Sequence, residues 1–308
     1  MFIKSLFMTF LILINQSALQ AKPLCGQKGV WLQVLGSGGP ELDDGRASSG
    51  YLIWFNGKAR VLVDMGAGSL LHFEQSGALM NDLDVLLFSH FHTDHSNDLP
   101  ALIMGSYFSD RRRDLPLYGP MGNELMPSAT QFVQALFGRS ASDQSGAFHY
   151  LHSYLDGSDS YRLLPHNVDT GSKAPLVVMS DSTYRISTVP VHHGPIPALA
   201  WRVDIGGKSL VFSGDMSNKN NTLLSLAKQA DLLVAHHAIA EEASGVARNL
   251  HMPPSVIGQI AAKANVKQLV LSHRMNRTLG REQASTQFIR RAYTGPLHYA
   301  DDLQCFRP

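Results

Sequence analysis

The sequence predicts an α+β protein in which two β-sheets pack against each other and helices cover their outer faces. Short apolar segments typical of strands alternate with segments of helical periodicity along most of the 308 residues. No repeat of solenoid length and no low-complexity run interrupts this order. Because each strand or helix buries mainly one apolar face, these elements are expected to pack as layers around a shared core.

The first 21 residues are predicted to be a signal peptide. Lys4 supplies a positive charge, residues 6–14 form an apolar segment too short to span a bilayer, and residues 17–21 offer an A-x-A-like cleavage site. The alternative is an uncleaved membrane anchor. We expect a periplasmic or secreted protein without a stable membrane anchor, in which residues 22–308 form a single domain.

The first half of this domain is predicted to contain four strands and two helices. The strands are expected at residues 30–35, 51–55, 60–63 and 84–89, with a hairpin turn at Asn56-Gly57, and the helices at residues 96–108 and 126–137. Residues 138–182 are rich in Ser, Gly and Asp and show no clear periodicity. They are predicted to be an extended loop, either a lid over a site or an insertion without a role.

The second half of the domain is also predicted to alternate between strands and helices, with five strands and two helices. The strands are expected at residues 184–191, 200–205, 209–213, 231–235 and 268–272, with a turn at Gly206-Gly207, and the helices at residues 253–264 and 282–292. The first of these helices begins with prolines, which are tolerated in the first turn of a helix.

Charge and cysteine content limit the partners and the compartment. Without Lys4 the chain has 25 basic and 25 acidic residues, so it offers no overall attraction for a polyanion. We therefore expect a small-molecule substrate and no nucleic acid. Cys25 and Cys305 are the only cysteines, and in an oxidising compartment they are predicted to form one disulfide; the alternative is two free thiols.

The most specific motif is the cluster His90-Phe91-His92-Thr93-Asp94-His95, an HxHxDH pattern. It places four nitrogen or oxygen ligands within six residues, which suits a short loop that holds two adjacent metal ions. The alternative, a histidine-rich surface loop, does not account for this regular spacing. We interpret the loop as a metal site.

Metal-type residues also follow four apolar strands. His90 follows residues 85–89, and the other three strands lead to His192-His193, Asp215 and His273. A single histidine after a strand is more often structural than a ligand, but four such cases in one chain favour a common site. Ligands at strand ends are held by a rigid scaffold while the loops stay open to solvent.

These motifs resemble the metallo-β-lactamase fold superfamily, and in particular its ribonuclease Z and arylsulfatase-like branch. The HxHxDH cluster is specific to the superfamily, while Val-Asp-Met-Gly at Asp64, His-Gly-Pro at His193 and Ser-Gly-Asp at Asp215 narrow the resemblance to the branch. The resemblance implies a four-layer αββα sandwich with a dinuclear metal site at one edge of the sheets. It covers most of the chain, from residue 35 to residue 274.

The resemblance also implies a ligand set. One metal ion would be held by His90, His92 and His193 and the other by Asp94, His95 and His273, while the Asp215 carboxylate bridges both. Such a set suits two Zn²⁺ ions best, with Mn²⁺ or Fe²⁺ as alternatives. His192 competes with His193, which is favoured because it directly precedes Gly194-Pro195.

Other residues are predicted to act around the ligands. Asp64 is expected to orient a ligand histidine, although an Asp before Gly66 is also typical of a turn. Asp94 could accept a proton from water, and His251 is the candidate acid for the leaving group, with an ordinary loop residue as the alternative. Where the branch carries His-Glu, this chain has His236-His237, and His237 is the candidate to orient the acid.

Together these features predict an exported dinuclear zinc hydrolase of small phosphodiesters or sulfate esters that uses a metal-bound hydroxide. The enzymatic alternative is hydrolysis of a lactone, thioester or β-lactam at the same site. The non-enzymatic alternative is that the chain is a non-catalytic metal-binding periplasmic protein. Transfer-RNA maturation is not expected, because only 22 positions separate His193 from Asp215 and leave no room for the long RNA-binding arm of ribonuclease Z enzymes.

Overall fold

A computed structural model describes residues 25–140, 145–169 and 171–308. The predicted signal peptide at residues 1–21 lies outside these residues. The described chain forms two seven-stranded sheets. Each sheet combines an antiparallel half with a parallel half, so both are mixed.

The first sheet has the strand order β14-β1-β2-β3-β4-β5-β6. Its strands are β1 (Val30–Gly36), β2 (Gly50–Phe55), β3 (Lys58–Met65), β4 (Val85–Leu87), β5 (Leu115–Pro120), β6 (Leu163–Val168) and β14 (Cys305–Phe306). Strands β3 to β6 are parallel to one another. Left-handed backbone angles at Asn56 and Gly57 form the tight turn between β2 and β3, as the sequence predicted.

The second sheet has the order β13-β12-β11-β10-β9-β8-β7. Its strands are β7 (Leu176–Ser180), β8 (Tyr184–His193), β9 (Ile196–Ile205), β10 (Lys208–Phe212), β11 (Leu232–His236), β12 (Leu269–Ser272) and β13 (Leu297–Tyr299). Strands β10 to β13 are parallel, and β8 runs in the same direction because the antiparallel strand β9 separates it from β10.

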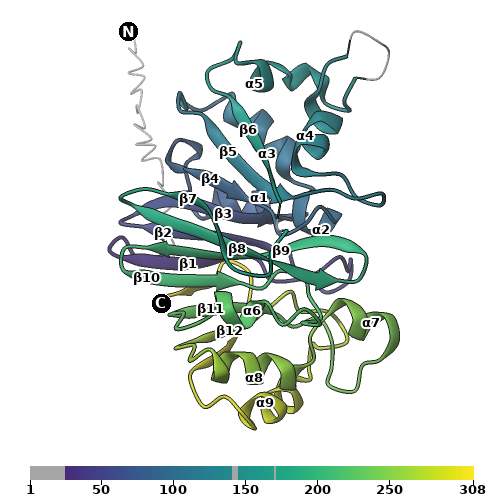
Figure 1. Ribbon diagram of the computed structural model, residues 1–308. Coiled ribbons are helices and arrows are strands. Elements are labelled where there is room, and N and C mark those ends of the chain that lie inside the picture. Colours follow the sequence, from purple (N-terminus) through teal and green to yellow (C-terminus); the bar gives the residue numbers. More distant parts are fainter. Residues whose placement is uncertain (1–24, 141–144, 170) are drawn as a thin grey trace, which may run out of the picture.

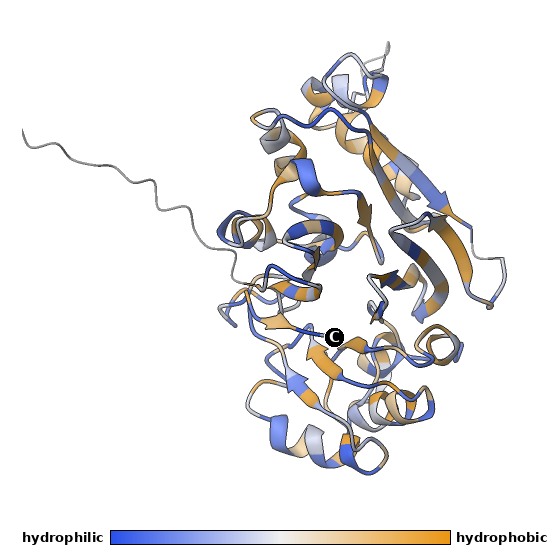
Figure 2. Ribbon diagram, turned by 90° about the vertical axis from the view of Figure 1, so that its left-hand side faces the viewer, coloured by the Kyte–Doolittle hydropathy of each residue, from blue (hydrophilic) through white to orange (hydrophobic). Residues whose placement is uncertain are grey.

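Helices cover the outer face of each sheet (Figure 1). The helices are α1 (Ser69–Gln75), α2 (Thr93–Ser96), α3 (Leu99–Ser106), α4 (Ala129–Phe137), α5 (Ser153–Asp156), α6 (Leu223–Leu226), α7 (Gly245–Leu250), α8 (Pro254–Lys263) and α9 (Glu282–Arg290), with 3₁₀ turns at η1 (Met80–Asp82) and η2 (His149–Leu151). Blue and orange residues alternate along the outer helices, as expected for helices that bury one face (Figure 2).

Three apolar clusters separate the four layers. Side chains on β1 and β2 alternate between two of them: Leu52 and Trp54 face α1, α3 and α4, whereas Tyr51 and Ile53 face the other sheet. A third cluster joins the outer face of the second sheet to α6, α8 and α9. These layers confirm the predicted αββα sandwich.

The prediction of a long loop at residues 138–182 was wrong for two segments. Strand β6 pairs in parallel with β5 at the edge of the first sheet, and β7 pairs with β8 at the edge of the second. Both are edge strands, and β6 buries only two of its six residues while β7 buries none of its five, so they lack the alternating burial that identifies strands in a sequence. The predicted helix at residues 96–108 is confirmed as α3, and the separate short helix α2 ends where the prediction begins.

The two ends of the described chain meet at the first sheet. Cys25 and Cys305 form a disulfide, as the sequence predicted, and β14 pairs with β1 directly beside it. The bond joins residues 280 positions apart. Among the residues that the structure describes, no helix is long and apolar enough to cross a membrane.

Removing the disulfide should lower stability. The double variant Cys25→Ser/Cys305→Ser is expected to lose about 3 kcal/mol of unfolding free energy, because the bond limits the freedom of a very long loop in the unfolded chain. Urea denaturation measures this change. The wild type in reductant should then match the variant, and equal stability of oxidised wild type and variant would contradict a stabilising role.

Candidate metal centre

Strand direction gathers the candidate ligands at one edge of the sandwich. His193, Asp215 and His273 lie at or just after the carboxyl ends of β8, β10 and β12, which run in the same direction. In the other sheet, the His90–His95 loop follows the carboxyl end of β4. Carboxyl ends of parallel strands meet at one edge of a sheet, so residues far apart in the sequence become neighbours.

One group of three histidines joins the two sheets. Ligand atoms of His90, His92 and His193 lie within 4.8 Å of one another. Nε2 of His90 is 3.0 Å from Nδ1 of His92, and the rings of His90 and His193 are 4.9 Å apart. This is the first of the two ligand groups that the resemblance implied.

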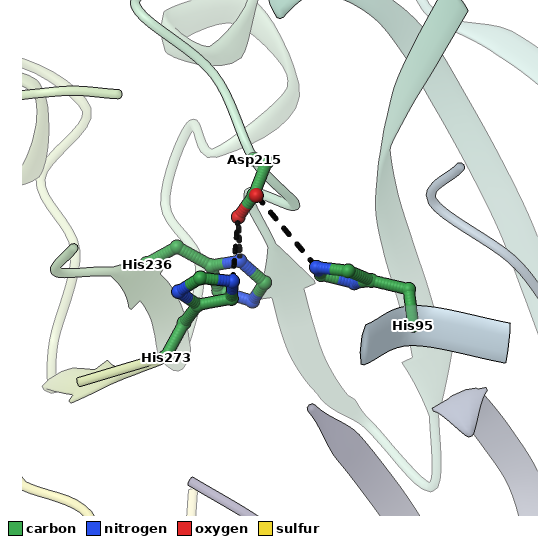
Figure 3. A group of neighbouring side chains, drawn as sticks. All are labelled: His95, Asp215, His236 and His273. Atoms are coloured by element: carbon green, nitrogen blue, oxygen red, sulfur yellow. Dashed lines mark hydrogen bonds and ion pairs between the residues drawn. The ribbon is translucent and has the colours of Figure 1, made fainter. Parts of the chain in front are cut away.

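The second group surrounds Asp215, whose carboxylate points into the cluster (Figure 3). Its Oδ1 is 3.4 Å from Nε2 of His273, and its Oδ2 is 3.7 Å from Nε2 of His95. The same Oδ2 lies 3.7 Å from Nε2 of His193, in the first group. The carboxylate of Asp215 therefore lies between the two groups, where a bridging ligand would be placed.

Asp94 completes the predicted set. Its Oδ2 is 3.2 Å from Nε2 of His273 and 3.5 Å from Nε2 of His95. All seven predicted ligand positions thus come together in the structure.

The residues fit a metal ion. Nε2 of His95 and Nε2 of His193 are buried and have no hydrogen-bond partner among the described residues. Buried polar atoms normally have partners, so unpaired ring nitrogens that face carboxylates are suited to bind a cation. Imidazole and carboxylate together are the donors that zinc and related divalent metals prefer.

The charges of the cluster support this interpretation. Burial would raise the pKa of Asp94, but His95 and His273 lower it to about 2. Burial would lower the pKa of His273, but Asp215 and Asp94 raise it, so without metal this imidazole holds a proton more tightly than usual. A bound cation would replace such protons as the partner of the carboxylates, so metal binding should release protons.

Asp64 orients His95, as predicted. Its Oδ2 lies 2.8 Å from Nδ1 of His95, and the carboxylate also accepts hydrogen bonds from the Ser89 amide and hydroxyl. Asp64 has a left-handed backbone (φ 55°), which is unusual for a residue other than glycine and typical of functional sites. At Gly66, a Cβ atom would lie 2.1 Å from the backbone oxygen of Asp94, so only glycine allows β3 to approach the metal loop.

The structure also separates His193 from its neighbour. His193 faces the cluster and its Nδ1 lies 3.0 Å from the backbone oxygen of Leu250, whereas Nδ1 of His192 is 2.7 Å from the hydroxyl of Ser217. Consecutive strand residues point to opposite faces, so only one of the pair can be a ligand.

His236 is part of the cluster and was not identified from the sequence. Its Nδ1 lies 2.7 Å from Oδ1 of Asp215 (Figure 3). The hydroxyl of Tyr51 is 3.1 Å from its Nε2. Burial lowers the pKa of His236 to about 4, so a neutral imidazole lies against the Asp215 carboxylate. The signal was present, because His236 ends an apolar strand just as the predicted ligands do.

The prediction that His237 orients His251 was wrong. Nε2 of His237 lies 2.9 Å from the hydroxyl of Ser285 on α9, and its ring is next to Tyr299. It follows His236 in the extended chain and therefore points to the opposite side, away from the metal centre. Glu241 does not replace it, because its carboxylate accepts hydrogen bonds from Ser255 at the start of α8.

His251 lies at the edge of the cluster, at the end of α7. Its Nδ1 is buried, has no hydrogen-bond partner in the described part of the chain, and lies 3.9 Å from Oδ1 of Asp215. Its ring is 5.4 Å from that of His193 and 5.7 Å from that of His273. Burial lowers its pKa to about 3, so the imidazole is neutral near pH 7.

An αββα sandwich with this donor set at its edge defines a metal-dependent hydrolase of the metallo-β-lactamase fold. The family model described as "Beta-lactamase superfamily domain" matches residues 59–274. That is more than half of the chain, which therefore belongs to this superfamily, as its motifs predicted.

Individual relatives indicate the ribonuclease Z-like branch of this superfamily. A ribonuclease Z from Thermobifida fusca (strain YX) is 27% identical, over 88% of this chain and 92% of its own length. The structure of human tRNase Z, short form, matches with a TM-score of 0.67 and 18% identity over 90% of this chain and 98% of that one. The metallo-β-lactamase fold protein YhfI from Bacillus subtilis gives 0.68 and 20%, with the same coverage.

His237 should make stability depend on pH. Burial lowers its pKa from 6.5 to about 4, so the unfolded chain binds a proton there between these values while the folded protein does not. Stability is therefore lost as the pH falls from 6.5 towards 4, by about 2–3 kcal/mol between pH 7 and pH 4.5.

The variant His237→Gln should lack this part of the pH dependence while retaining a partner for Ser285. Urea denaturation at pH 7 and pH 4.5 measures it. The control is His149→Gln, which replaces an exposed histidine. Its stability should change between the two pH values as that of the wild type does. An identical loss of stability in the wild type and in His237→Gln would exclude this role.

Proposed function

We propose that this protein is an exported dinuclear zinc hydrolase that cleaves small phosphodiesters or sulfate esters. The position of the Asp215 carboxylate between two groups of ligands carries this proposal, because a carboxylate in that position can bind two adjacent metal ions at once. His90, His92 and His193 would hold one ion, and Asp94, His95 and His273 the other. The predominance of imidazole favours Zn²⁺ over Mn²⁺ or Fe²⁺.

Two bound metal ions would supply Lewis-acid activation of water and of the ester. The residues of the chain then position and move protons. Asp94, whose carboxylate is ionised at neutral pH, is the acceptor for the proton of the attacking water. His251 is the donor to the leaving oxygen; it is neutral before substrate binds, and an anionic phosphoryl or sulfuryl group beside it would favour its protonated form.

The short connection between His193 and Asp215 supports a small substrate. His193 and Ile196 pair across a tight Gly194-Pro195 turn, and β9 and β10 then lead directly to Asp215. This short path leaves no arm to hold a large RNA, although the curated relatives named ribonuclease Z support a phosphodiester substrate. Export is supported by the predicted signal at residues 1–21 and by the Cys25–Cys305 disulfide, which persists in oxidising compartments.

A substrate panel tests this proposal. The purified protein is analysed for metal and then assayed with bis(p-nitrophenyl) phosphate, p-nitrophenyl sulfate and a lactone. We expect about two zinc ions per chain and hydrolysis of the phosphodiester or the sulfate, which is lost with a chelator and restored by Zn²⁺. Turnover of the lactone alone, or of no ester by zinc-loaded protein, would contradict the proposal.

The variant Asp215→Ala should lose the bridge between the two ligand groups. We expect a loss of at least one metal ion per chain and a fall in kcat of about a thousandfold or more. Elemental analysis and the phosphodiester assay measure the two effects. Asp110→Ala, which removes an exposed carboxylate after α3, should retain both metal and activity. Near-normal turnover by Asp215→Ala would refute the bridging role.

The loss of rate in the variant His251→Ala should depend on the leaving group of the substrate. Alkyl esters need a proton on the leaving oxygen and should be slowed by about 10²–10⁴-fold, whereas activated nitrophenyl esters should change little. Rates for a matched pair of esters with alkoxide and nitrophenolate leaving groups test this. Equal slowing of both esters would show that His251 is not the acid.

A further inference from the structure

An apolar groove lies beside the metal centre on the side of the first sheet. Its volume is about 590 Å³, and its apolar wall includes Phe91, Met104, Phe132, Leu136, Phe148 and Tyr150. These residues come from the metal loop, α3, α4 and the segment around η2. We call it the aromatic groove. Its occupant is not a segment of the described chain.

The aromatic groove begins within the metal loop itself. Phe91 stands between the ligands His90 and His92 in the chain, but its side chain turns away from them and stacks on Phe132, with the ring centres 4.4 Å apart. The HxHxDH loop thus presents ligands on one side and an apolar wall on the other. An ester held by these ligands would therefore have an apolar wall on the same loop.

A second, polar cleft adjoins the aromatic groove. It has a volume of about 740 Å³ and includes the ligand Asp94 together with Arg46 and Asp302. Thr93 and Asn97 line both the polar cleft and the aromatic groove, so the two meet next to Asp94. A molecule that spans the junction would place a charged group at the metal centre and an apolar group in the groove.

The exposed wall of the groove favours an apolar ligand. Tyr150 is 59% exposed and Met104 36% exposed, although each could gain from burial. Two polar groups that line the groove are already used within the protein: the hydroxyl of Ser96 donates to the backbone oxygen of His92, and Asp98 accepts from the amide of Leu70. Thr93 and Asn97, which also line the groove, lie at its junction with the polar cleft.

We infer that the aromatic groove binds an alkyl or aryl group of the substrate, so that the enzyme prefers amphiphilic esters over small polar ones. This inference rests on the proposed function, because it assigns one end of the substrate to the metal centre. It names the substrate class as phosphodiesters or sulfate esters that carry one extended apolar substituent.

A binding experiment tests the groove without catalysis. Octylphosphonate and methylphosphonate, which are not hydrolysed, are titrated into the zinc-loaded protein by calorimetry. The octyl compound should bind about tenfold or more tightly, because burial of each methylene group is favourable. Equal affinity of the two phosphonates would overturn the inference.

Two variants and two matched controls locate the effect. Ala101→Trp, at an exposed position of α3 on the groove, should fill the groove and abolish the preference for the octyl compound. Tyr150→Ser should weaken the preference by removing part of the wall. Ala284→Trp on α9 and Tyr107→Ser, whose tyrosine is 64% exposed outside the groove, should retain it. An unchanged preference in both groove variants would overturn the inference.

Kinetics then distinguish this inference from the proposed function. The wild type should hydrolyse p-nitrophenyl octyl phosphate with a kcat/KM about tenfold or more above that of p-nitrophenyl methyl phosphate, and Ala101→Trp should reduce only this ratio. If both esters are hydrolysed equally well, the function stands and the groove assignment fails. If neither is hydrolysed while octylphosphonate binds preferentially, the groove assignment stands and the proposed function fails.

Discussion

The structure depends on a buried carboxylate held among imidazoles. Asp215 lies within 4 Å of nitrogen atoms from His95, His193, His236 and His273, which reach it from both sheets. The pKa of Asp215 lies well below its usual value because His273, His251, His95 and His236 outweigh the cost of burial. An ionised group in such a dry position needs compensating charge, so this one side chain links the two sheets and is also where a cation would bind.

Residues close to the C-terminal cysteine contact the same region. Asp302, next to the disulfide, accepts hydrogen bonds from the amide and hydroxyl of Ser37 and from the amide of Ala47. Asp301 pairs with Arg46 and with Arg274, and Arg274 directly follows the ligand His273. The disulfide therefore lies beside a C-terminal turn that contacts the loop between β1 and β2 and the residue that follows His273.

Local patterns in the sequence were sufficient for most of the fold and for the ligands. The strands that carry His90, His193, Asp215 and His273 are buried apolar segments, which propensity and burial identify together. Strands β6 and β7 were missed because these edge strands lack the alternation of buried and exposed residues that identifies a strand in a sequence. His236 was missed although it ends an apolar strand, because the sequence does not show which ring of the pair His236-His237 faces the site.

The class of site is predictable from the sequence, because the HxHxDH spacing and the histidines and carboxylates after apolar strands depend only on local order. For His192 and His193 the following Gly194-Pro195 already favoured His193, but for His236 and His237 only the packed structure shows which ring faces the metal centre. Consecutive side chains in an extended segment point to opposite faces, and only the packing of the sheets shows which face is the active one. The aromatic groove likewise exists only because α3, α4 and η2 meet beside the metal loop.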